Sequence, residues 1–483
     1  MSAARQPTTD SADLQTAQTP PQRATVSDVL RRYGPSFLRA ARNQLEPWEA
    51  RALRELMQCR TADMGGHHWQ CSRCGYNHLA YNTCHNRHCA GCGRERRRQW
   101  LERVSQWTLP APYFHLVFTA PHELNPLIEA NRSLLYKLQL RAPARAIHRL
   151  AARADGPLGA FQPGLISVLH SWGQEMLRHV HSHHVLAGCG PRLGAGAPEW
   201  VVCQGRELPL DPALLADTYR DVFLRALRRL HKAGELKMPG ALGMWDGRQE
   251  FRRFLAPLSE IRWVVFCGSP EHVSRPDAAL GYLARYASGA AIGDARIVGD
   301  TQGEVTIRIK DYRTGENTTR AMPGDEFVRR FMLHILPPRF SRIRFNGFLG
   351  SNIREARLAE ARRQLGPRDI KEEEAAAPPP VDTVDAGAGE LELDFERKCP
   401  RCKFRTLVFL CNLMASVNSW RRIHDTTPSS VRQRQERSLL TIASVQLELP
   451  LAGDEDTDEG SGEEGDRPER DNQAAHTTGA RPP

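Results

Sequence analysis

Seven candidate metal ligands lie close together near the start of the chain. They follow the order C-x11-C-x2-C-x9-C-x3-H-C-x2-C and comprise Cys59, Cys71, Cys74, Cys84, His88, Cys89 and Cys92. Zinc takes four sulfur or nitrogen ligands in a tetrahedron, and each C-x2-C pair supplies two thiolates from one tight turn. The pairs 71/74 and 89/92 therefore predict one complete zinc site. The spacing leaves open a second site, formed by Cys59, Cys84, His88 and either His67 or His68.

These zinc sites are predicted to be structural, because an ion with four protein ligands has no position left for a substrate. An arginine-rich run follows the last cysteine directly, with two tryptophans close behind, and comprises Arg94, Arg96, Arg97 and Arg98. Arginines beside aromatic rings are typical of surfaces that bind phosphates and stack on bases. A solvated helix face is the alternative interpretation of the same residues.

A histidine-rich segment, HVHSHH, carries His179, His181, His183 and His184. In a β-strand alternate side chains point to the same side, so residues 179, 181 and 183 would share one face. Two imidazoles at positions i and i+2 can hold a divalent ion and leave other coordination positions for water and phosphate oxygens. The segment predicts a catalytic metal site, with a solvent-exposed histidine run as the alternative.

Two tyrosines, Tyr282 and Tyr286, lie four residues apart in GYLARYASGAAIG. In a helix a four-residue step returns to within about 40° of the same direction, so both rings would lie on one face. A phenol with a pKa near 10 is a poor nucleophile unless a metal ion or a base assists it. A histidine-bound cation on a scissile phosphate would provide that assistance. Two aromatic residues in a core stripe are the alternative.

The segments that must position these residues alternate between strand and helix patterns. Strands are expected at 113–119, 165–174, 262–269 and 304–313, and through the histidine-rich segment. Helices are expected at 26–45, 47–59, 127–154, 219–234, 277–293 and 324–336. The pattern predicts an α+β fold, in which an antiparallel sheet with flanking helices follows a small zinc-binding domain.

The charge of the chain indicates a polyanionic partner. Lys plus Arg number 66 against 56 for Asp plus Glu, which gives a net charge of +10. Residues 451–483 hold ten acids and three bases, so the rest of the chain carries +17. A body this basic favours nucleic acid as the partner. No run of about 18 apolar residues and no signal peptide is visible, so we expect a cytoplasmic protein without a membrane span.

Composition divides the chain into six parts. Residues 1–25 and 451–483 lack apolar periodicity and are expected to be disordered. Residues 26–108 are expected to form a zinc-binding, DNA-binding domain and 110–365 the main domain. The stretch 366–396 is acidic and rich in Pro, Ala and Gly, which predicts a linker. The short piece 397–450 contains CPRCKFRTLVFLC, whose single C-x2-C pair leaves a further zinc site and ordinary cysteines both open.

The order of these motifs resembles a known family. The cysteine-rich segment is followed by PYFHLVFTAPHELNPL, HVHSHHVLAGCG, YLARYASGAAIGDARI and RFMLHILPPRFSRIRFNGFLG. From about residue 30 to 365 this order resembles the insertion-sequence-91 family of transposases, which are two-tyrosine HUH transposases. The resemblance implies an antiparallel-sheet HUH nuclease behind a zinc-binding domain. It also implies rolling-circle-like transposition, in which single-stranded DNA is cut and rejoined through 5′-phosphotyrosine intermediates.

Carried over by position, the resemblance implies that His181 and His183 are the HUH pair and that Tyr282 and Tyr286 are the nucleophiles. The HUH pair would hold Mg²⁺ or Mn²⁺, and the N-terminal domain one or two structural zinc ions. The implied partners are single-stranded DNA, hairpins at the element ends and target DNA, at the nucleoid of a bacterial cell. A slip of two residues would instead make His179 and His181 the pair.

Further contributors to the catalytic site are expected. A third metal ligand is expected, and its candidates are Gln174, Glu175 and His115. The candidates for phosphate contacts are Arg285, Arg342 and Arg344. The alternative is that these arginines are solvated charges on the surface.

The segment also departs from the family pattern. Ser182 stands between the HUH histidines in place of a bulky apolar residue, His184 stands where cysteine is common, and Cys189 interrupts a glycine run. Ser182 is expected to weaken packing behind the strand rather than to remove a ligand. It keeps open a second hypothesis, a non-catalytic zinc-dependent DNA-binding protein that is either a decayed transposase or a regulator.

Overall fold

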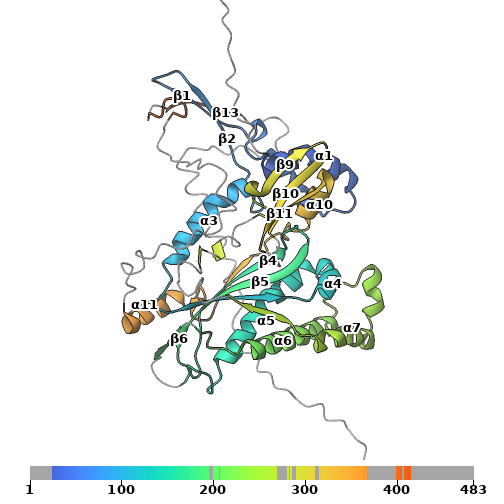
Figure 1. Ribbon diagram of the computed structural model, residues 1–483, viewed down its shortest axis with the longest axis vertical. Coiled ribbons are helices and arrows are strands. Elements are labelled where there is room, and N and C mark those ends of the chain that lie inside the picture. The colour runs from blue at the N-terminus through green and yellow to red at the C-terminus, as the bar shows by residue number, and fades with distance from the viewer. Residues whose placement is uncertain are drawn as a thin grey trace, which may run out of the picture.

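The computed structural model describes residues 24–194, 199–205, 207–268, 280–281, 283–284, 290–310, 315–366, 399–404 and 407–414. Figure 1 shows two bodies of secondary structure joined by the long helix α3, Ala90–Ser105. The two tyrosines at 282 and 286, and Arg285 between them, lie outside the described residues.

A five-stranded antiparallel sheet lies at the centre of the larger body, in the strand order β12-β4-β5-β3-β8. Its strands are β3 (Tyr113–Thr119), β4 (Leu165–Trp172), β5 (Arg178–Ala187), β8 (Val264–Cys267) and β12 (Ile343–Asn346). The predicted α+β class with an antiparallel sheet is confirmed. The histidine-rich segment forms β5, the middle strand of the sheet.

Helices cover one face of this sheet. They are α4 (Asn125–Ala130), α5 (Arg132–Ala151), α6 (Pro212–Lys232) and α7 (Arg248–Glu260). One core joins apolar residues of α5, α6 and α7 to alternate strand residues such as Leu165, Leu169 and Leu186. The helix expected over 127–154 is interrupted at Asn131, where the backbone leaves the helical region and the side-chain amide donates to the carbonyls of Leu127 and Lys237.

A second core covers the opposite face of the sheet. It contains the intervening strand residues, among them Ile166, Val168 and Val185, as the period of two in a strand requires. Packed with them are side chains from α3, from α11 (Arg354–Leu365) and from the small hairpin of β6 (Cys189–Pro191) and β7 (Trp200–Val202). The two sheet faces therefore lie in separate environments.

The smaller body contains the helices α1 (Val26–Ala40), α2 (Pro47–Gln58) and α10 (Gly324–Met332) and the sheet β11-β10-β9. These strands span Ile297–Thr301 (β9), Glu304–Lys310 (β10) and Asn317–Pro323 (β11). A third core unites α1 and α2 with residues 291–335, and the Tyr33 hydroxyl donates to Asp300 Oδ1 at 2.9 Å. The first helices of the chain thus share a core with a segment 267 residues further on at the Tyr33–Asp300 contact.

A small sheet completes the fold and joins distant parts of the chain. The hairpin of β1 (Gly66–Cys71) and β2 (Asn77–Tyr81) pairs with β13 (Leu407–Leu413) in the order β13-β1-β2, seen at the top of Figure 1. Short 3-10 turns occur at Ala62–Met64, His122–Leu124, Gly240–Trp245, Asp294–Arg296 and Gly347–Leu349. Among the described helices, none has the length and apolar character that crossing a membrane requires.

Candidate metal centres

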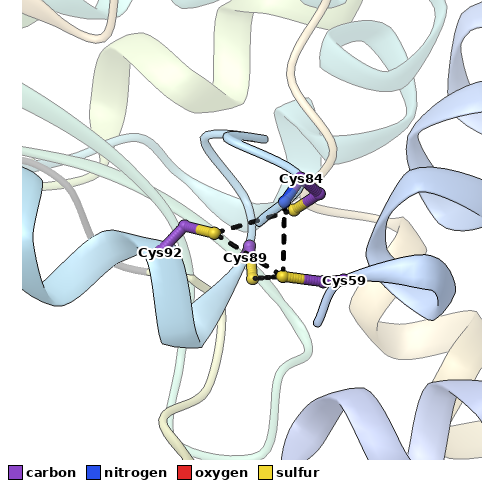
Figure 2. Close-up of side chains that lie close together, drawn as sticks. All are labelled: Cys59, Cys84, Cys89 and Cys92. Carbon is purple, nitrogen blue, oxygen red and sulfur yellow. Dashed lines mark hydrogen bonds between the residues drawn. The ribbon is translucent and has the colours of Figure 1, made fainter. Parts of the chain in front are cut away.

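Four cysteines converge between helices α2 and α3. Cys59 follows the last residue of α2, Cys84 lies in the loop after β2, and Cys89 and Cys92 begin α3. Their sulfur atoms all lie within 4.8 Å of one another, and Figure 2 shows the four side chains pointing inward to a common centre.

The sulfur separations match a zinc tetrahedron. A tetrahedron with metal–sulfur bonds of about 2.3 Å has edges of about 3.8 Å. The Sγ atom of Cys59 lies 3.6 Å from those of Cys89 and Cys92, and the Sγ atoms of Cys84 and Cys92 are 3.8 Å apart. Two backbone N–H groups also point at the sulfurs, from Cys84 to Cys59 and from Asn86 to Cys84, each at 3.4 Å. The donor set fits zinc.

Ionised cysteines in this cluster would need a cation to balance their charge. Contact with the sulfurs of Cys59, Cys89 and Cys92, together with burial, raises the pKa of the Cys84 thiol. Four thiolates at such separations repel one another unless a positive ion compensates their charge. A zinc ion would therefore hold the end of α2 against the start of α3.

The cysteine grouping differs from the sequence prediction, which paired 71/74 with 89/92. In the structure Cys71 and Cys74 lie instead with Cys399 and Cys402. His88, expected as a ligand, is buried elsewhere, where its Nε2 atom accepts from the Leu336 N–H at 3.2 Å.

The alternative ligands His67 and His68 lie on strand β1 and hydrogen-bond to asparagine side chains, His67 to Asn412 at 2.9 Å and His68 to Asn77 at 3.1 Å. No described histidine joins either cysteine group. The grouping of the cysteines has a structural cause. The C-x2-C turn at 71–74 lies within the β1–β2 hairpin, whereas the turn at 89–92 begins helix α3. The two turns therefore belong to different elements and do not meet.

Three histidines form a further candidate centre on the central sheet. His170 lies on β4, and His181 and His183 lie on β5, with their nearest ring nitrogens all within 4.8 Å. Antiparallel pairing places His170 directly opposite His181 and Val168 opposite His183. All three imidazoles are buried, and the exposed His179 lies outside the group.

The ring nitrogens of this group are arranged as metal ligands are. Nδ1 of His170 lies 2.9 Å from Nε2 of His181, close to the 3.0 Å or so that separates neighbouring ligands in an octahedron with bonds of about 2.1 Å. The other nitrogen of His181, Nδ1, is 2.8 Å from the His179 carbonyl and so carries the hydrogen. This bond leaves Nε2 as the acceptor, which fits a metal site whose imidazole is oriented by a second hydrogen bond.

Burial also keeps these imidazoles in the form that binds a metal. Burial, and then the neighbouring His181 and His183, hold the pKa of His170 well below its usual range. Burial lowers the pKa of His181 to about 4. Neutral imidazole is the ligand form, so both rings are ready to bind a divalent ion at neutral pH.

The candidates for a third ligand have other roles in the structure. His115 on β3 lies beside His183, with its Nε2 atom 3.0 Å from His183 Nδ1 and the rings stacked. Glu175 forms ion pairs with Arg320 and Arg330 instead, and the backbone carbonyl of Gln174 accepts from Arg296.

His170 was missed by the sequence analysis. The signal lay in the predicted strand 165–174: its only histidine comes just before a Gly-containing turn that leads to the histidine-rich segment. A strand residue just before such a turn lies opposite a residue of the next strand, on the same face of the sheet.

On the other face of β5, the unusual Ser182 belongs to a buried hydrogen-bond network. Its hydroxyl lies 2.8 Å from His184 Nε2 and accepts from the Gln139 side chain at 3.1 Å. His184 Nδ1 meets the Ser167 hydroxyl at 2.8 Å, and Tyr219 donates to Gln139 Oε1 at 2.9 Å. The network supplies hydrogen bonds where apolar packing was expected, so Ser182 is integrated into the fold rather than a defect in it.

The candidate DNA-binding arginines differ in their surroundings. On α3, Arg94 is exposed, Arg98 pairs with Glu95, and Arg96 donates to the carbonyls of Asn86 and Cys92. Arg97 of the same helix is half-buried. Arg96 therefore braces the cysteine centre, whereas Arg94 faces solvent.

The arginines near β12 are less accessible. Arg342 is buried over the ring of Trp172, and burial, with Arg87 and Arg96 nearby, lowers its pKa to about 9. Burial, and then Arg141 of helix α5, lowers the pKa of Arg344. Arg342 thus lies near His170, whereas Arg344 lies on the side of the sheet that the helices cover.

Described residues on either side of Tyr282 pack on the histidine-bearing face of the sheet. Leu280, Leu283 and Ala284 are helical and buried, and the two leucines belong to the same core as Val168 and Val185. These valines share a strand face with His170 and His183, two residues away in each strand.

Comparison with known proteins identifies the family. Residues 29–120 match the model of a transposase zinc-binding domain, and residues 164–357 match the model of a putative transposase. The chain is 38% identical to "Putative transposase y4qJ" of Sinorhizobium fredii (strain NBRC 101917 / NGR234) over 380 residues, which are 78% of this chain and 92% of that protein. It is 27% identical to "Transposase for insertion sequence element IS801" of Pseudomonas savastanoi pv. phaseolicola over 314 residues, 63% and 71% of the two chains. No solved structure matches.

The zinc-binding module and the sheet domain together define an insertion-sequence transposase, an enzyme class that transfers DNA strands. The chain belongs to the insertion-sequence-91 family of transposases, as the resemblance of its motifs implied. Its DNA partner and its zinc-binding domain follow from that membership.

Proposed function

We propose that this transposase cuts and rejoins single-stranded DNA in rolling-circle-like transposition, with Tyr282 and Tyr286 as nucleophiles. The observation that carries the proposal is the convergence of His170, His181 and His183 on one face of the central sheet. Family membership supplies the strand-transfer activity, and the histidine group supplies a place for the scissile phosphate.

The three histidines would hold Mg²⁺ or Mn²⁺ at this face. When bound, the ion polarises the scissile phosphate and neutralises the charge that develops on it. Three protein ligands would leave further coordination positions for phosphate oxygens and water. The His179 carbonyl and His115 orient the imidazoles of His181 and His183 through their second nitrogens.

In the proposed reaction a tyrosine oxygen forms a bond to phosphorus, and the bond from phosphorus to the 3′ oxygen breaks. The phenol loses a proton, the 3′ oxygen gains one, and the 5′ end remains attached to the enzyme. Two tyrosines would let one strand stay covalently held while the other is cut. The helical residues Leu280 and Leu283 support the assignment of the tyrosines as nucleophiles. They are close to Tyr282 in the sequence and are buried in the core on the histidine-bearing face of the sheet.

We further propose that the cysteine centre of Cys59, Cys84, Cys89 and Cys92 binds structural zinc and orients α3 toward DNA. Among the arginines at 94–98, Arg94 is best placed to contact phosphate, because its side chain is exposed. The substrates are the hairpin ends of the element and its target, in the bacterial cytoplasm at the nucleoid.

The test is covalent adduct formation on single-stranded DNA that carries the element end. With Mn²⁺, the full-length protein should give an SDS-stable adduct, which chelation removes. His170→Ala and the double variant Tyr282→Phe/Tyr286→Phe should each abolish it. His179→Ala is the matched control, because it removes an exposed imidazole of the same segment and keeps the carbonyl that orients His181.

Adducts that persist in the double tyrosine variant would refute the assignment of the nucleophiles. Wild-type protein that shifts the same DNA in a native gel but forms no adduct with Mn²⁺ would favour a non-catalytic DNA-binding protein. Activity of His170→Ala equal to that of His179→Ala would refute the three-histidine site.

A further inference from the structure

We infer that Cys71, Cys74, Cys399 and Cys402 form a second structural zinc site, which fastens the C-terminal segment of the chain to the N-terminal zinc-binding domain. Cys399 and Cys402 lie beyond both regions that match the family models. The inference does not depend on the catalytic proposal, since none of these residues belongs to the histidine centre.

The four sulfurs are spaced as zinc ligands. All lie within 4.8 Å of one another. The Sγ atoms of Cys71 and Cys402 are 3.6 Å apart, and those of Cys74 and Cys399 are 3.7 Å apart. These distances again match the edge of about 3.8 Å in a zinc–thiolate tetrahedron. They are far longer than the S–S bond of about 2.05 Å in a disulfide.

The two C-x2-C turns have the same backbone geometry. In the first turn, Cys71 N–H donates to the Tyr76 carbonyl at 2.9 Å, and Gly75 N–H donates to the Cys71 carbonyl at 2.9 Å. In the second, Cys399 N–H donates to the carbonyl five residues on at 2.7 Å, and Lys403 N–H donates back to Cys399 at 2.8 Å. Each turn thus closes with the same pair of offsets, i to i+5 and i+4 to i.

The second turn contains a strained residue at the matching place. Gly75 has φ +68°, which glycine adopts freely, and Lys403 has φ +61° at the equivalent position. A lysine in the left-handed region is sterically unfavourable and persists only where its surroundings impose that shape. A metal ion that requires two thiolates from one tight turn would impose it.

Strand β13 extends the contact between the two ends of the chain. It pairs with β1 from Leu407 opposite Cys71 to Leu413 opposite Gly66. The ring of Phe409 meets that of Trp69 edge-on at 5.3 Å between centroids. The two turns also meet directly, because the Arg73 guanidinium lies 3.4 Å from the centre of the Phe404 ring.

Apolar burial alone is too weak to hold this segment. Val408, Phe409 and Leu410 are each about half exposed on β13. A three-stranded sheet of this size, open on its faces, has little stability of its own. Zinc bound by four thiolates contributes binding free energy directly to folding, so it can hold a strand that packing does not.

The first experiment measures zinc per chain in reduced, full-length protein by elemental analysis. The two four-cysteine groups predict two zinc ions in the wild type. Cys399→Ser/Cys402→Ser should lower the content to one. Cys411→Ser is the matched control, because this exposed cysteine lies on β13 outside both groups and its loss should leave two.

The second experiment maps thiol alkylation by mass spectrometry. Cys71 and Cys74 should be protected in the wild type and become alkylated in Cys399→Ser/Cys402→Ser, although the substitutions lie more than 320 residues away. Continued protection of Cys84 and Cys92 in that variant shows that the first site has kept its fold. Unchanged zinc content, unchanged protection of Cys71 and Cys74, or disulfides between the four cysteines in the wild type would each overturn the inference.

Discussion

Ser182→Ala tests whether the polar network behind the histidine strand supports the fold. The Ser182 hydroxyl donates to the Gln139 backbone carbonyl at 3.1 Å. Four residues after Gln139 the helix α5 contains Pro143, which has no N–H to donate to that carbonyl. The serine of the sheet therefore satisfies a helix carbonyl that proline leaves without its helical partner.

The size of the effect follows from the groups that lose a bond. Removing the hydroxyl leaves the Gln139 carbonyl, one Gln139 side-chain N–H and His184 Nε2–H without this partner, all in a buried region. A buried polar group without a partner costs about 1–3 kcal/mol. We expect a loss of about 3–5 kcal/mol, which lowers the melting temperature by roughly 10 °C in a domain of this size.

The assay is thermal and urea unfolding of zinc-loaded protein, followed by circular dichroism. Ser259→Ala is the control, since it removes a helix-surface hydroxyl bonded only locally, and should change stability by no more than about 0.5 kcal/mol. Adding Pro143→Ala restores a backbone N–H, so it should stabilise Ser182→Ala by about 1 kcal/mol more than it stabilises the wild type. Equal melting of Ser182→Ala and Ser259→Ala, or the absence of that coupling, would refute the reasoning.

Two further predictions concern pH and the contact between the two bodies. Burial lowers the pKa of His148 to about 4 in the folded chain, against about 6.5 in the unfolded chain. The free energy of unfolding is therefore highest above pH 6.5, and it falls by about 3 kcal/mol as the pH is lowered to 4. His148→Gln should make urea unfolding less sensitive to acid over that range; an unchanged pH profile counts against it. Arg87 donates to the carbonyls of Leu336, Pro337 and Phe340. Arg87→Met should therefore lower the free energy of unfolding by about 3–5 kcal/mol, and Arg87→Lys should recover only part of that stability, as measured by melting curves. Full recovery of stability by lysine would contradict the role of Arg87 in binding three carbonyls.

Local patterns predicted the strands of the central sheet well. The strand at 113–119 and the alternation that puts His181 and His183 on one face both agree with the structure. These features depend on neighbouring residues, which a sequence displays directly. His170 was not predicted, because its contact with His181 depends on the register between two strands. That register follows from the hairpin turn and from packing on both faces of the sheet.

The cysteine grouping could not be predicted for a different reason. Spacing shows which cysteines share a turn, and both C-x2-C turns of the N-terminal region were found. It does not show which turns meet. The partner of Cys71 and Cys74 lies beyond residue 398, and only the tertiary fold brings it back. The placement of Tyr282 and Tyr286 stays a prediction, because both lie outside the described residues.

The long reach between the two halves of the Cys71–Cys402 cluster has a consequence for biosynthesis. The halves are separated by 325 residues or more, so at roughly 5–20 residues per second a ribosome needs about 15–65 s to deliver the second half after the first. During that interval the nascent chain offers Cys71 and Cys74 the cysteines of the first centre, and later Cys189, Cys203 and Cys267, but not Cys399 and Cys402. A newly made transposase thus passes through a period in which the wrong thiols are the nearest ones. Its final arrangement requires either that Cys59, Cys84, Cys89 and Cys92 capture their ion early, or that thiolates exchange on the metal when the end of the chain arrives.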